Sequence, residues 1–438
     1  MKYRLLVFLI FVAASVSAQD AYNLKRCLDA GLERNFDIRL IRNEQQISDN
    51  NFTPGNAGYL PTVDLSAGSS GAVSDTKQKL IPSGESLESK GVNSTTTNAG
   101  INLNWTVFDG FKIQATYSRL KELQQMGELN TRLTIEDFVA QLSSEYFNYI
   151  RQIIRLKNLK YAVGLSRERL RIVEAQYTIG SMSRLDLQQA RVDFNADSSS
   201  LIKQYEVLHT SRIQLNKMMA LDEIDQPLIV ADSVIYFNPL LEKSDLSASM
   251  MQSNTELLIA KKSSAISQLD YKIVKSRDYP YLRLNAGYGY TGNTYATGSY
   301  SRQDVMGFNY GLSLGFTVFD GFNRKRERRN ARLQIENNAL QYERLSLALD
   351  ADFSKIWMAY QNNLDLLNLE KENLGTAKEN YEIAIERYKL GALSGIELRE
   401  AQNSLLGAEE RLLEAQYNTK LCEISLMLIS GEIGTYME

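Results

Sequence analysis

Residues Thr106-Val-Phe-Asp-Gly-Phe111 recur unchanged as Thr317-Val-Phe-Asp-Gly-Phe322, an offset of 317 − 106 = 211 residues. Each copy follows an alternating apolar pattern typical of a strand and precedes a long pattern typical of a helix. A second motif, Tyr-x-x-Gly-x-x-Ser, begins at Tyr177 and again at Tyr388, and 388 − 177 is also 211. Two motifs with one offset indicate an internal duplication. The repeated unit is strand, corner, long helix, tight turn and return helix.

Long helices are predicted in both halves, because residues 83–226 and 281–438 contain no proline. Apolar residues also recur there at every seventh position, which predicts helices wound around each other in a left-handed supercoil. These residues are Leu142, Tyr149, Leu156, Val163, Leu170 and Tyr177, and then Phe353, Tyr360, Leu367, Leu374, Tyr381 and Tyr388. A helix from about 111 to 177 would be roughly 100 Å long. Such helices must lie side by side in a rod or tube. Shorter helices are expected at about 23–50 and 244–275.

Residues 1–18 have the features of a secretory signal peptide. Lys2 and Arg4 precede the apolar run 5–14, and small residues allow cleavage after Ala18. The sequence therefore predicts an exported protein. Without Lys2 and Arg4 the formal net charge changes from −3 to −5, which is too mild to indicate a nucleic-acid partner.

The two cysteines, Cys27 and Cys422, lie on predicted helices near the ends of the chain. An exported protein permits a disulfide between them, and two separate half-buried thiols are the other interpretation. His209 is the only histidine of the chain, which argues against histidine metal sites and histidine-dependent triads. Because no nucleotide loop, nucleophile elbow or metal cluster occurs either, we predict no enzyme activity and no cofactor.

Four segments alternate apolar and polar residues with a period of two, as strands with one apolar face do. They are residues 59–68, 101–107, 282–290 and 308–318. Their length of about ten residues, the aromatics at their ends and their small polar second face favour a lipid-facing β-barrel. The polar stretches 74–97 and 291–304 are expected to be the connecting loops. A sandwich in a soluble domain is the alternative.

Four strands cannot close a barrel in a membrane, because the smallest such barrels have eight and lipid does not tolerate an open edge. The chain must therefore contribute its strands to a shared barrel. Two, three or four copies would give eight, twelve or sixteen strands.

The duplicated corners and the tip motifs 177–190 and 388–401 resemble those of the TolC family of outer-membrane efflux and secretion channels. The resemblance covers nearly the whole mature chain and implies a mainly α fold class with a small β portion. It implies a homotrimer in which a twelve-stranded β-barrel in the outer membrane continues as a twelve-helix α-barrel, built of long antiparallel coiled-coil helices, through the periplasm. It further implies three partners: outer-membrane lipid, a periplasmic adaptor, and an inner-membrane transporter of the RND, ABC or MFS type.

The duplication and the resemblance together predict four parts of the chain. They are a signal peptide at 1–18, a first repeat at 19–225, an equatorial linker at 226–243 and a second repeat at 244–438.

Acidic residues follow each predicted tip: Asp186 in the first repeat, and Glu397 and Glu400 in the second. The resemblance implies that the residues at Glu397 and Glu400 surround the periplasmic entrance and help to keep it closed. In a trimer each carboxylate would form a ring that favours cations. A solvated charge pattern is the alternative.

The tips themselves are expected to turn at Gly180 and Gly391, two left-handed C-caps, while Ser183 and Ser394 cap the return helices. The resemblance adds the docking of an adaptor hairpin beside these tips.

The strand–helix corners contain Asp109-Gly110 and Asp320-Gly321. We interpret both aspartates as N-caps rather than catalytic groups. The basic run 324–329 follows the second corner. It could contact lipid head groups or form a solvated, partly paired surface.

The predicted function is a passive, gated channel of a tripartite efflux or type I secretion system. A trimeric, barrel-anchored coiled-coil surface protein without transport is the alternative. Such proteins place one barrel at one end of the chain, whereas here strands occur in both halves, which favours the channel.

Overall fold

The computed structural model describes residues 21–79, 81–296 and 300–437, so the predicted signal peptide at 1–18 lies outside the described residues. Two compact units are present. One contains the chain up to Glu44 together with Glu128–Ile259 and Glu343–Glu438, and the other contains Gln45–Gly127 and Ala260–Tyr342. Each unit combines segments of both sequence repeats. The two predicted repeats therefore do not coincide with the two compact units of the structure.

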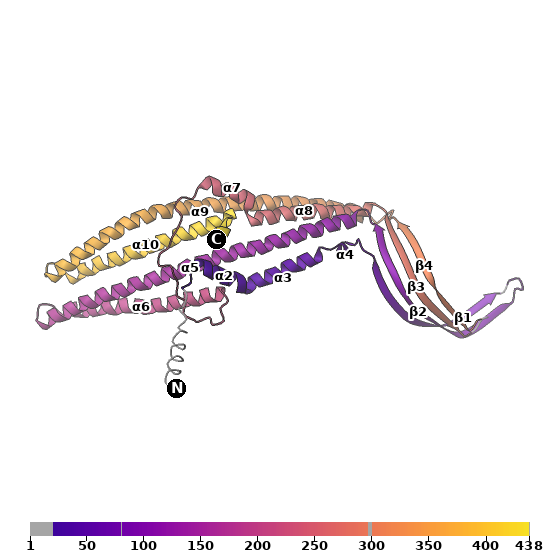
Figure 1. Cartoon of the computed structure of the whole chain (residues 1–438), viewed down its shortest axis with the longest axis horizontal. Helices are drawn as coiled ribbons and strands as arrows, with labels where there is room; N and C mark the ends of the chain where they lie inside the picture. Colours follow the sequence, from indigo (N-terminus) through magenta and orange to yellow (C-terminus); the bar gives the residue numbers. More distant parts are fainter. Residues whose placement is uncertain (1–20, 80, 297–299, 438) are drawn as a thin grey trace, which may run out of the picture. The chain divides into compact units, whose positions relative to one another are not determined.

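The first unit is helical, and two long helices run into it (Figure 1). Helices α5 (Lys112–Thr178) and α9 (Asn323–Lys389) have 67 residues each, and their starts are 323 − 112 = 211 residues apart. Each is followed by a return helix, α6 (Arg184–Met218) and α10 (Gly395–Ser430). The predicted first helix, 111–177, is thus confirmed to within one residue at each end.

The seven-residue repeat packs the long helices, as predicted. All of its members except Tyr177 are buried or contact a buried cluster. The cluster nearest the helix turns combines residues of α5, α6, α9 and α10: Val173, Leu187, Ala190, Tyr381, Ala384, Tyr388, Leu398, Ala401 and Leu405. The two hairpins therefore share one apolar core at their tips.

The shorter helices are broken, whereas the sequence predicted one continuous helix in each half. The observed helices are α2 (Leu24–Arg34) and α3 (Phe36–Asn51) in the first half, and α7 (Lys243–Ser253) and α8 (Thr255–Lys275) in the second. Among the described residues, no helix combines the length and the apolar character needed to cross a membrane.

An asparagine causes each break. Asn35 donates from its side-chain amide to the Met218 carbonyl at 3.1 Å, and Asn254 donates to the Ile429 carbonyl at 3.0 Å. In both cases the side-chain oxygen accepts from a backbone N–H of the next helix. Asparagine competes with the helical backbone in this way, so it ends one helix, starts the next and holds the end of a return helix.

The predicted linker 226–243 packs against the helices of the first unit. The Tyr149 hydroxyl donates to the Leu228 carbonyl at 3.1 Å, and the Tyr146 hydroxyl donates to the Asp232 carboxylate at 2.6 Å. Leu228 is buried in the largest apolar cluster, which also includes the 3₁₀ helix η2 (Ile433–Met437) through its first residue. The linker is therefore a fixed part of this unit.

The second unit contains one antiparallel sheet with the order β1-β2-β3-β4. Its strands are β1 (Thr62–Lys79), β2 (Ser86–Phe108), β3 (Tyr281–Tyr295) and β4 (Arg302–Gly315), and the short helix α4 (Pro54–Ala57) precedes them. The strands lie in a single sheet among the described residues, which is not the arrangement of a sandwich. Strands β1 and β4 form the two edges.

The strands are longer than predicted, and the predicted loop 74–97 is wrong. Strands β1 and β2 continue as a two-stranded ribbon as far as the pair Lys79 and Ser86. The Asp75 carboxylate accepts from the Gly91 N–H at 2.7 Å there. The strand residues of this ribbon are exposed on both faces, so their sequence lacks the apolar alternation that marks a half-buried strand. Backbone hydrogen bonds between β1 and β2 nevertheless hold the ribbon together. The loop predicted at 291–304 is likewise mostly strand.

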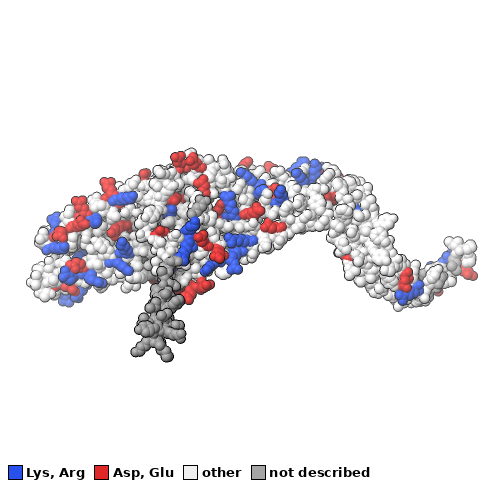
Figure 2. Space-filling model, viewed as in Figure 1, with Lys and Arg blue, Asp and Glu red and all other residues white. Residues whose placement is uncertain are grey.

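Charged side chains are unevenly distributed over the sheet. Figure 2 shows charges of both signs along the stretch that leads to the end of the β1–β2 ribbon, whereas the rest of the sheet on this face is almost free of charge. On the ribbon, Lys77 pairs with Glu88. One face of β4 consists of large exposed apolar residues, namely Phe308, Tyr310, Leu312 and Leu314. An uncharged, apolar band of this kind is typical of strands that face lipid.

Candidate functional site

The two hairpin tips turn at glycines, as predicted. Gly180 has φ 79° and Gly391 has φ 72°, a left-handed conformation that strains residues with a side chain. The N–H of Gly180 donates to the Tyr177 carbonyl at 3.0 Å, and the N–H of Gly391 donates to the Tyr388 carbonyl at the same distance. A Cβ atom at either glycine would meet nothing within 4 Å. The tips therefore need glycine for backbone geometry and leave open space around it.

Each return helix begins with a reciprocal capping box. Ser183 Oγ accepts from the Asp186 N–H at 3.2 Å, and the Asp186 carboxylate accepts from the Ser183 N–H at 3.1 Å. Ser394 and Glu397 repeat this arrangement at 3.2 and 2.9 Å. The predicted serine caps are thus confirmed, and 397 − 186 = 211 shows that the carboxylates are equivalent in the duplication.

These caps favour the ionised form of both carboxylates. The Ser183 hydroxyl, and after it the Ser183 N–H, holds the pKa of Asp186 below its ordinary value. The Ser394 N–H, and after it the Ser394 hydroxyl, lowers the pKa of Glu397. Both residues have a structural task. A role at an entrance, which remains a prediction, has to coexist with capping.

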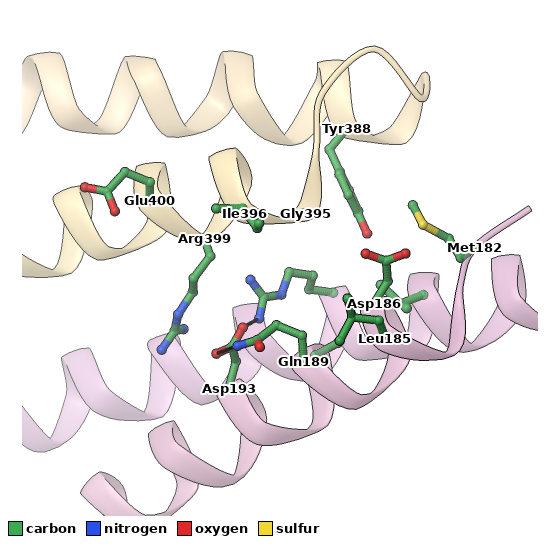
Figure 3. Close-up of a pocket in the computed structure, with 13 residues that line it drawn as sticks. Met182, Leu185, Asp186, Gln189, Asp193, Tyr388, Gly395, Ile396, Arg399 and Glu400 are labelled. Atoms are coloured by element: carbon green, nitrogen blue, oxygen red, sulfur yellow. Dashed lines mark hydrogen bonds and ion pairs between the residues drawn. The ribbon is translucent and has the colours of Figure 1, made fainter.

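A pocket of about 410 Å³ lies between the two tips (Figure 3). Its lining combines both hairpins: Arg169, Val173, Met182, Leu185, Asp186, Gln189, Ala190, Asp193, Tyr388, Gly395, Ile396, Arg399 and Glu400. Asp186 and Glu400, two of the three predicted entrance residues, both contribute to this lining, but the Glu400 carboxylate points away from Asp186 (Figure 3). Glu397 is not part of this lining.

An ion pair joins the two hairpins next to this pocket. Arg399 of α10 donates to both carboxylate oxygens of Asp197 on α6, at 2.7 and 2.8 Å. The two side chains are only 19% and 13% exposed. The hydrogen bond to Asp197 raises the pKa of Arg399. Ser166 of α5 bonds to Asp197, and Gln402 of α10 donates to the Ser166 hydroxyl at 3.1 Å. Bidentate contacts of this kind combine strength with a fixed geometry.

This network was not predicted from the sequence. Its positions are unlike in the two repeats, because Arg399 corresponds to Gln188 (399 − 211) and Asp197 corresponds to Ala408 (197 + 211). No sequence signal pairs these two residues, which are 202 positions apart. Arg169 and Asp193 form a second buried pair within the first hairpin.

The corner aspartates cap the long helices from further away than predicted. The Asp109 carboxylate accepts from the Ile113 N–H at 3.1 Å, and Asp320 accepts from the Arg324 N–H at 2.9 Å. The helices begin at Lys112 and Asn323, so each aspartate stands three residues before its helix and not at the N-cap position. The intervening Gly-Phe pair has positive φ at both residues and folds the carboxylate back onto the first turn.

The two corner glycines are not equivalent. Gly110 has φ 73°, and a Cβ there would lie 2.3 Å from the Ser276 carbonyl oxygen in the 3₁₀ helix η1 (Ser276–Asp278). Gly321 has φ 69°, but its Cβ would meet only the Asn323 amide at 3.7 Å. The first corner therefore requires glycine both for its left-handed backbone and for lack of space, whereas the second requires it only for its left-handed backbone.

The basic run after the second corner is partly paired. Arg324 bonds to Asp320 at 3.3 Å and Arg328 to Asp278 at 2.7 Å, while Lys325 and Arg329 are exposed. Contact with lipid head groups remains a prediction for these two cations.

Cys27 and Cys422 are free thiols, so the disulfide interpretation is not supported. Burial raises the pKa of Cys27 to about 12. Among residues 21–79, 81–296 and 300–437, no group of three or more His, Cys, Asp or Glu side chains is arranged to hold a metal ion.

Known proteins resemble the chain along most of its length. A profile of the family described as outer membrane efflux protein matches residues 28–221 and 246–432. The outer membrane protein TolC of Vibrio cholerae is 21% identical over 449 residues, which cover 98% of this chain and 95% of that protein. TolC of Escherichia coli K12 is 19% identical over 364 residues, covering 80% and 72%. The crystal structure of the Campylobacter jejuni CmeC outer membrane channel has a TM-score of 0.79 at 18% identity, covering 94% and 86%.

The fold class predicted from the sequence is confirmed: a mainly helical chain whose long helices build an α-barrel and whose four strands join a β-barrel shared between subunits. The outer-membrane location and the role as an efflux or secretion channel are confirmed as well, in preference to a surface protein without transport. Because the profile matches both halves of the duplication, the chain belongs to the family of outer membrane efflux proteins.

Proposed function

We propose that three copies of this chain close into one passive channel, which forms the outer-membrane exit of a tripartite efflux or type I secretion system. The single observation that carries the proposal is the open four-stranded sheet with edges β1 and β4. Unpaired strand edges cannot face lipid. Each edge must therefore pair with another copy, and three copies give twelve strands.

The gate of this channel is at the hairpin tips. Asp186, Glu397 and Glu400 place three carboxylates per chain around the entrance, and threefold repetition turns them into rings that favour cations. The ion pair between Arg399 and Asp197 fastens the second hairpin to the first. Opening requires this contact to break, so we infer that it stabilises the closed entrance.

The tips also receive the adaptor. Gly180, Ser183, Gly391 and Ser394 keep side chains small there, and the space next to both glycines is open. A helical hairpin of a periplasmic adaptor can approach such a surface closely. The adaptor would connect the channel to an inner-membrane transporter of the RND, ABC or MFS type, which supplies the energy. The channel itself then needs no covalent chemistry.

Conductance in planar lipid bilayers tests the proposal. The purified protein should behave as a trimer and give discrete, cation-preferring conductance steps without any energy source. The double variant Glu397→Arg, Glu400→Arg should lose the cation preference, because it reverses the charge of the rings. A single-chain particle without conductance would refute the channel. A conducting double variant with unchanged ion preference would refute only the entrance assignment.

A further inference from the structure

We propose that the pocket between the two hairpin tips binds an amphiphilic organic cation, a small molecule with one ammonium group, one hydrogen-bond acceptor and an apolar body. The site is formed within one chain by α5, α6, α9 and α10. Binding follows from the pocket alone. Only its consequence for transport rests on the gate proposed above.

Two buried donors at the pocket have no hydrogen-bond partner. The Tyr388 side chain is 1% exposed, and its hydroxyl makes no hydrogen bond. Figure 3 shows this hydroxyl pointing between the hairpins, on the side of Asp186. Arg169 is 4% exposed, and its Nε also lacks a partner although its Nη2 bonds to Asp193. Buried donors without partners are unfavourable, so an acceptor atom of a ligand would stabilise both.

The charges of the pocket select a cation. The lining arginines, Arg169 and Arg399, are each occupied by an aspartate. Asp186 and Glu400 line the pocket from opposite hairpins and form no ion pair with the described residues. The uncompensated charge is therefore negative. An ammonium group beside the Asp186 carboxylate would reduce this charge, whereas the Glu400 carboxylate points away from Asp186 (Figure 3).

The remaining wall is apolar. Val173, Met182, Leu185 and Ile396 line the pocket, and Leu185 and Ile396 are 77% and 78% exposed. Neither of these exposed side chains is needed for the capping boxes, which use only the serines and carboxylates. The volume of about 410 Å³ falls in the range of small-molecule sites, about 300–1,000 Å³. An aromatic or aliphatic body fits this wall.

A ligand held in this way would bridge the hairpins, because Asp186 and Arg169 belong to the first and Tyr388 to the second. It would therefore stabilise the same closed arrangement as the ion pair between Arg399 and Asp197. If the gate is at the tips, the bound cation reduces conductance.

Dansylcadaverine is a suitable probe, because it combines a primary ammonium, sulfonyl acceptors and a naphthalene ring whose fluorescence rises in apolar surroundings. We expect saturable binding of one probe per chain to the full-length protein in detergent. The N-acetylated probe, which has lost the charge, should bind about tenfold more weakly, as expected for the loss of a charged hydrogen-bonding group.

Three variants separate the parts of the site. Asp186→Asn keeps a side-chain oxygen for the Ser183 N–H but removes the charge, so it should weaken binding of the charged probe about tenfold and leave the acetylated probe unaffected. Tyr388→Phe keeps the ring but removes the donor, so it should weaken both probes. Glu382→Gln, an exposed glutamate outside the lining, is the matched control and should bind like the wild type. All variants must elute like the wild-type oligomer.

Equal binding of both probes, or wild-type affinity in both Asp186→Asn and Tyr388→Phe, would overturn the site. A signal that does not saturate and equals that of empty micelles would overturn it too. Normal conductance steps with no probe binding would overturn this inference and leave the channel intact. Saturable binding without a change in conductance would support the site and overturn its link to the gate.

Discussion

At the scale of single residues, the tips depend on interactions between neighbours in the sequence. Ser183 with Asp186 and Ser394 with Glu397 satisfy the first N–H groups of their helices and use only residues three positions apart. Such caps can be recognised in a sequence because their partners are local. Two of the three carboxylates that suggested an ion-selective entrance, those of Asp186 and Glu397, also cap the return helices.

Removing one cap hydroxyl should loosen its tip only. We expect Ser394→Ala to cost about 1 kcal/mol locally, which corresponds to about a fivefold rise in the exchange of the first amide hydrogens of α10. Hydrogen exchange read by mass spectrometry checks this, with Ser394→Thr as the control because threonine also caps. A similar rise at the first turn of α6 would contradict a local effect.

The tip caps should also weaken in acid. The pKa of Glu397 is lowered in the fold, so its contribution is complete above the ordinary carboxyl pKa of about 4.3 and is lost as the pH falls through the lower folded value. Exchange at the start of α10, corrected for its intrinsic pH dependence, should rise in that range. The variant Glu397→Gln, which caps without a charge, should show no such rise. If the rise in exchange at low pH persists in Glu397→Gln, another titrating group must cause it.

The two corner glycines should respond differently to the same substitution. Gly321→Ala should cost about 1–2 kcal/mol for the left-handed backbone alone. Gly110→Ala should cost more, because its Cβ would lie 2.3 Å from the Ser276 carbonyl oxygen. The temperature at which the folded oligomer is lost measures the stability of both variants. Equal losses would mean that the first corner can move away from the clash.

At the scale of elements, the sequence predicts those helices and strands that a periodic pattern or a local motif marks. Elements that depend on contacts between distant residues were not predicted. The seven-residue repeat from Leu142 and the glycine tip at 180 predicted a helix that the structure reproduces within one residue. The ribbon between 74 and 92 was missed because both of its faces are polar, so no alternation marks it as strand. The breaks at Asn35 and Asn254 depend on carbonyl groups of distant helices.

The pair between Arg399 and Asp197 was missed for a similar reason. It joins residues 202 positions apart, and it has no counterpart in the other repeat, so neither periodicity nor the duplication indicates it. Only the packing of one hairpin on the other brings the two side chains together.

Breaking that pair should favour an open entrance. We expect Asp197→Asn to weaken a charge-assisted contact by about 1–3 kcal/mol, which shifts a closed-to-open equilibrium about 5- to 150-fold. Single-channel recording in planar bilayers measures the open fraction. The exchanged variant Asp197→Arg, Arg399→Asp should return part of the closed state. An unchanged open fraction in Asp197→Asn would show that the gate closes without this contact.

At the scale of the whole molecule, the duplication supplies the two halves of one wall. Strand β2 of the first repeat pairs with β3 of the second over residues 94–108 and 282–295, so the repeats continue each other in the sheet. The polar network at the tips departs from this symmetry. Arg399 of the second hairpin pairs with Asp197 of the first, but the equivalent positions of the other repeat hold Gln188 and Ala408 and form no such pair. The equivalent elements of the two repeats therefore form the channel wall. Positions where the repeats differ, such as Arg399 and Asp197, are expected to control the opening of the channel.

The proposed barrel predicts opposite outcomes for two neighbouring residues of β4. Leu312 lies on the exposed apolar face and Ser313 on the other face. An arginine on a lipid-facing position costs about 2–4 kcal/mol near the bilayer centre, whereas a lumen position tolerates it. Leu312→Arg should therefore reduce the amount of folded oligomer in the outer membrane, while Ser313→Arg should assemble and change ion preference. The heat-modifiable electrophoretic band and bilayer conductance measure the two effects. Assembly of Leu312→Arg at wild-type levels, with loss of Ser313→Arg, would mean that the apolar face of this strand points into the lumen, and the shared barrel would have to be inverted.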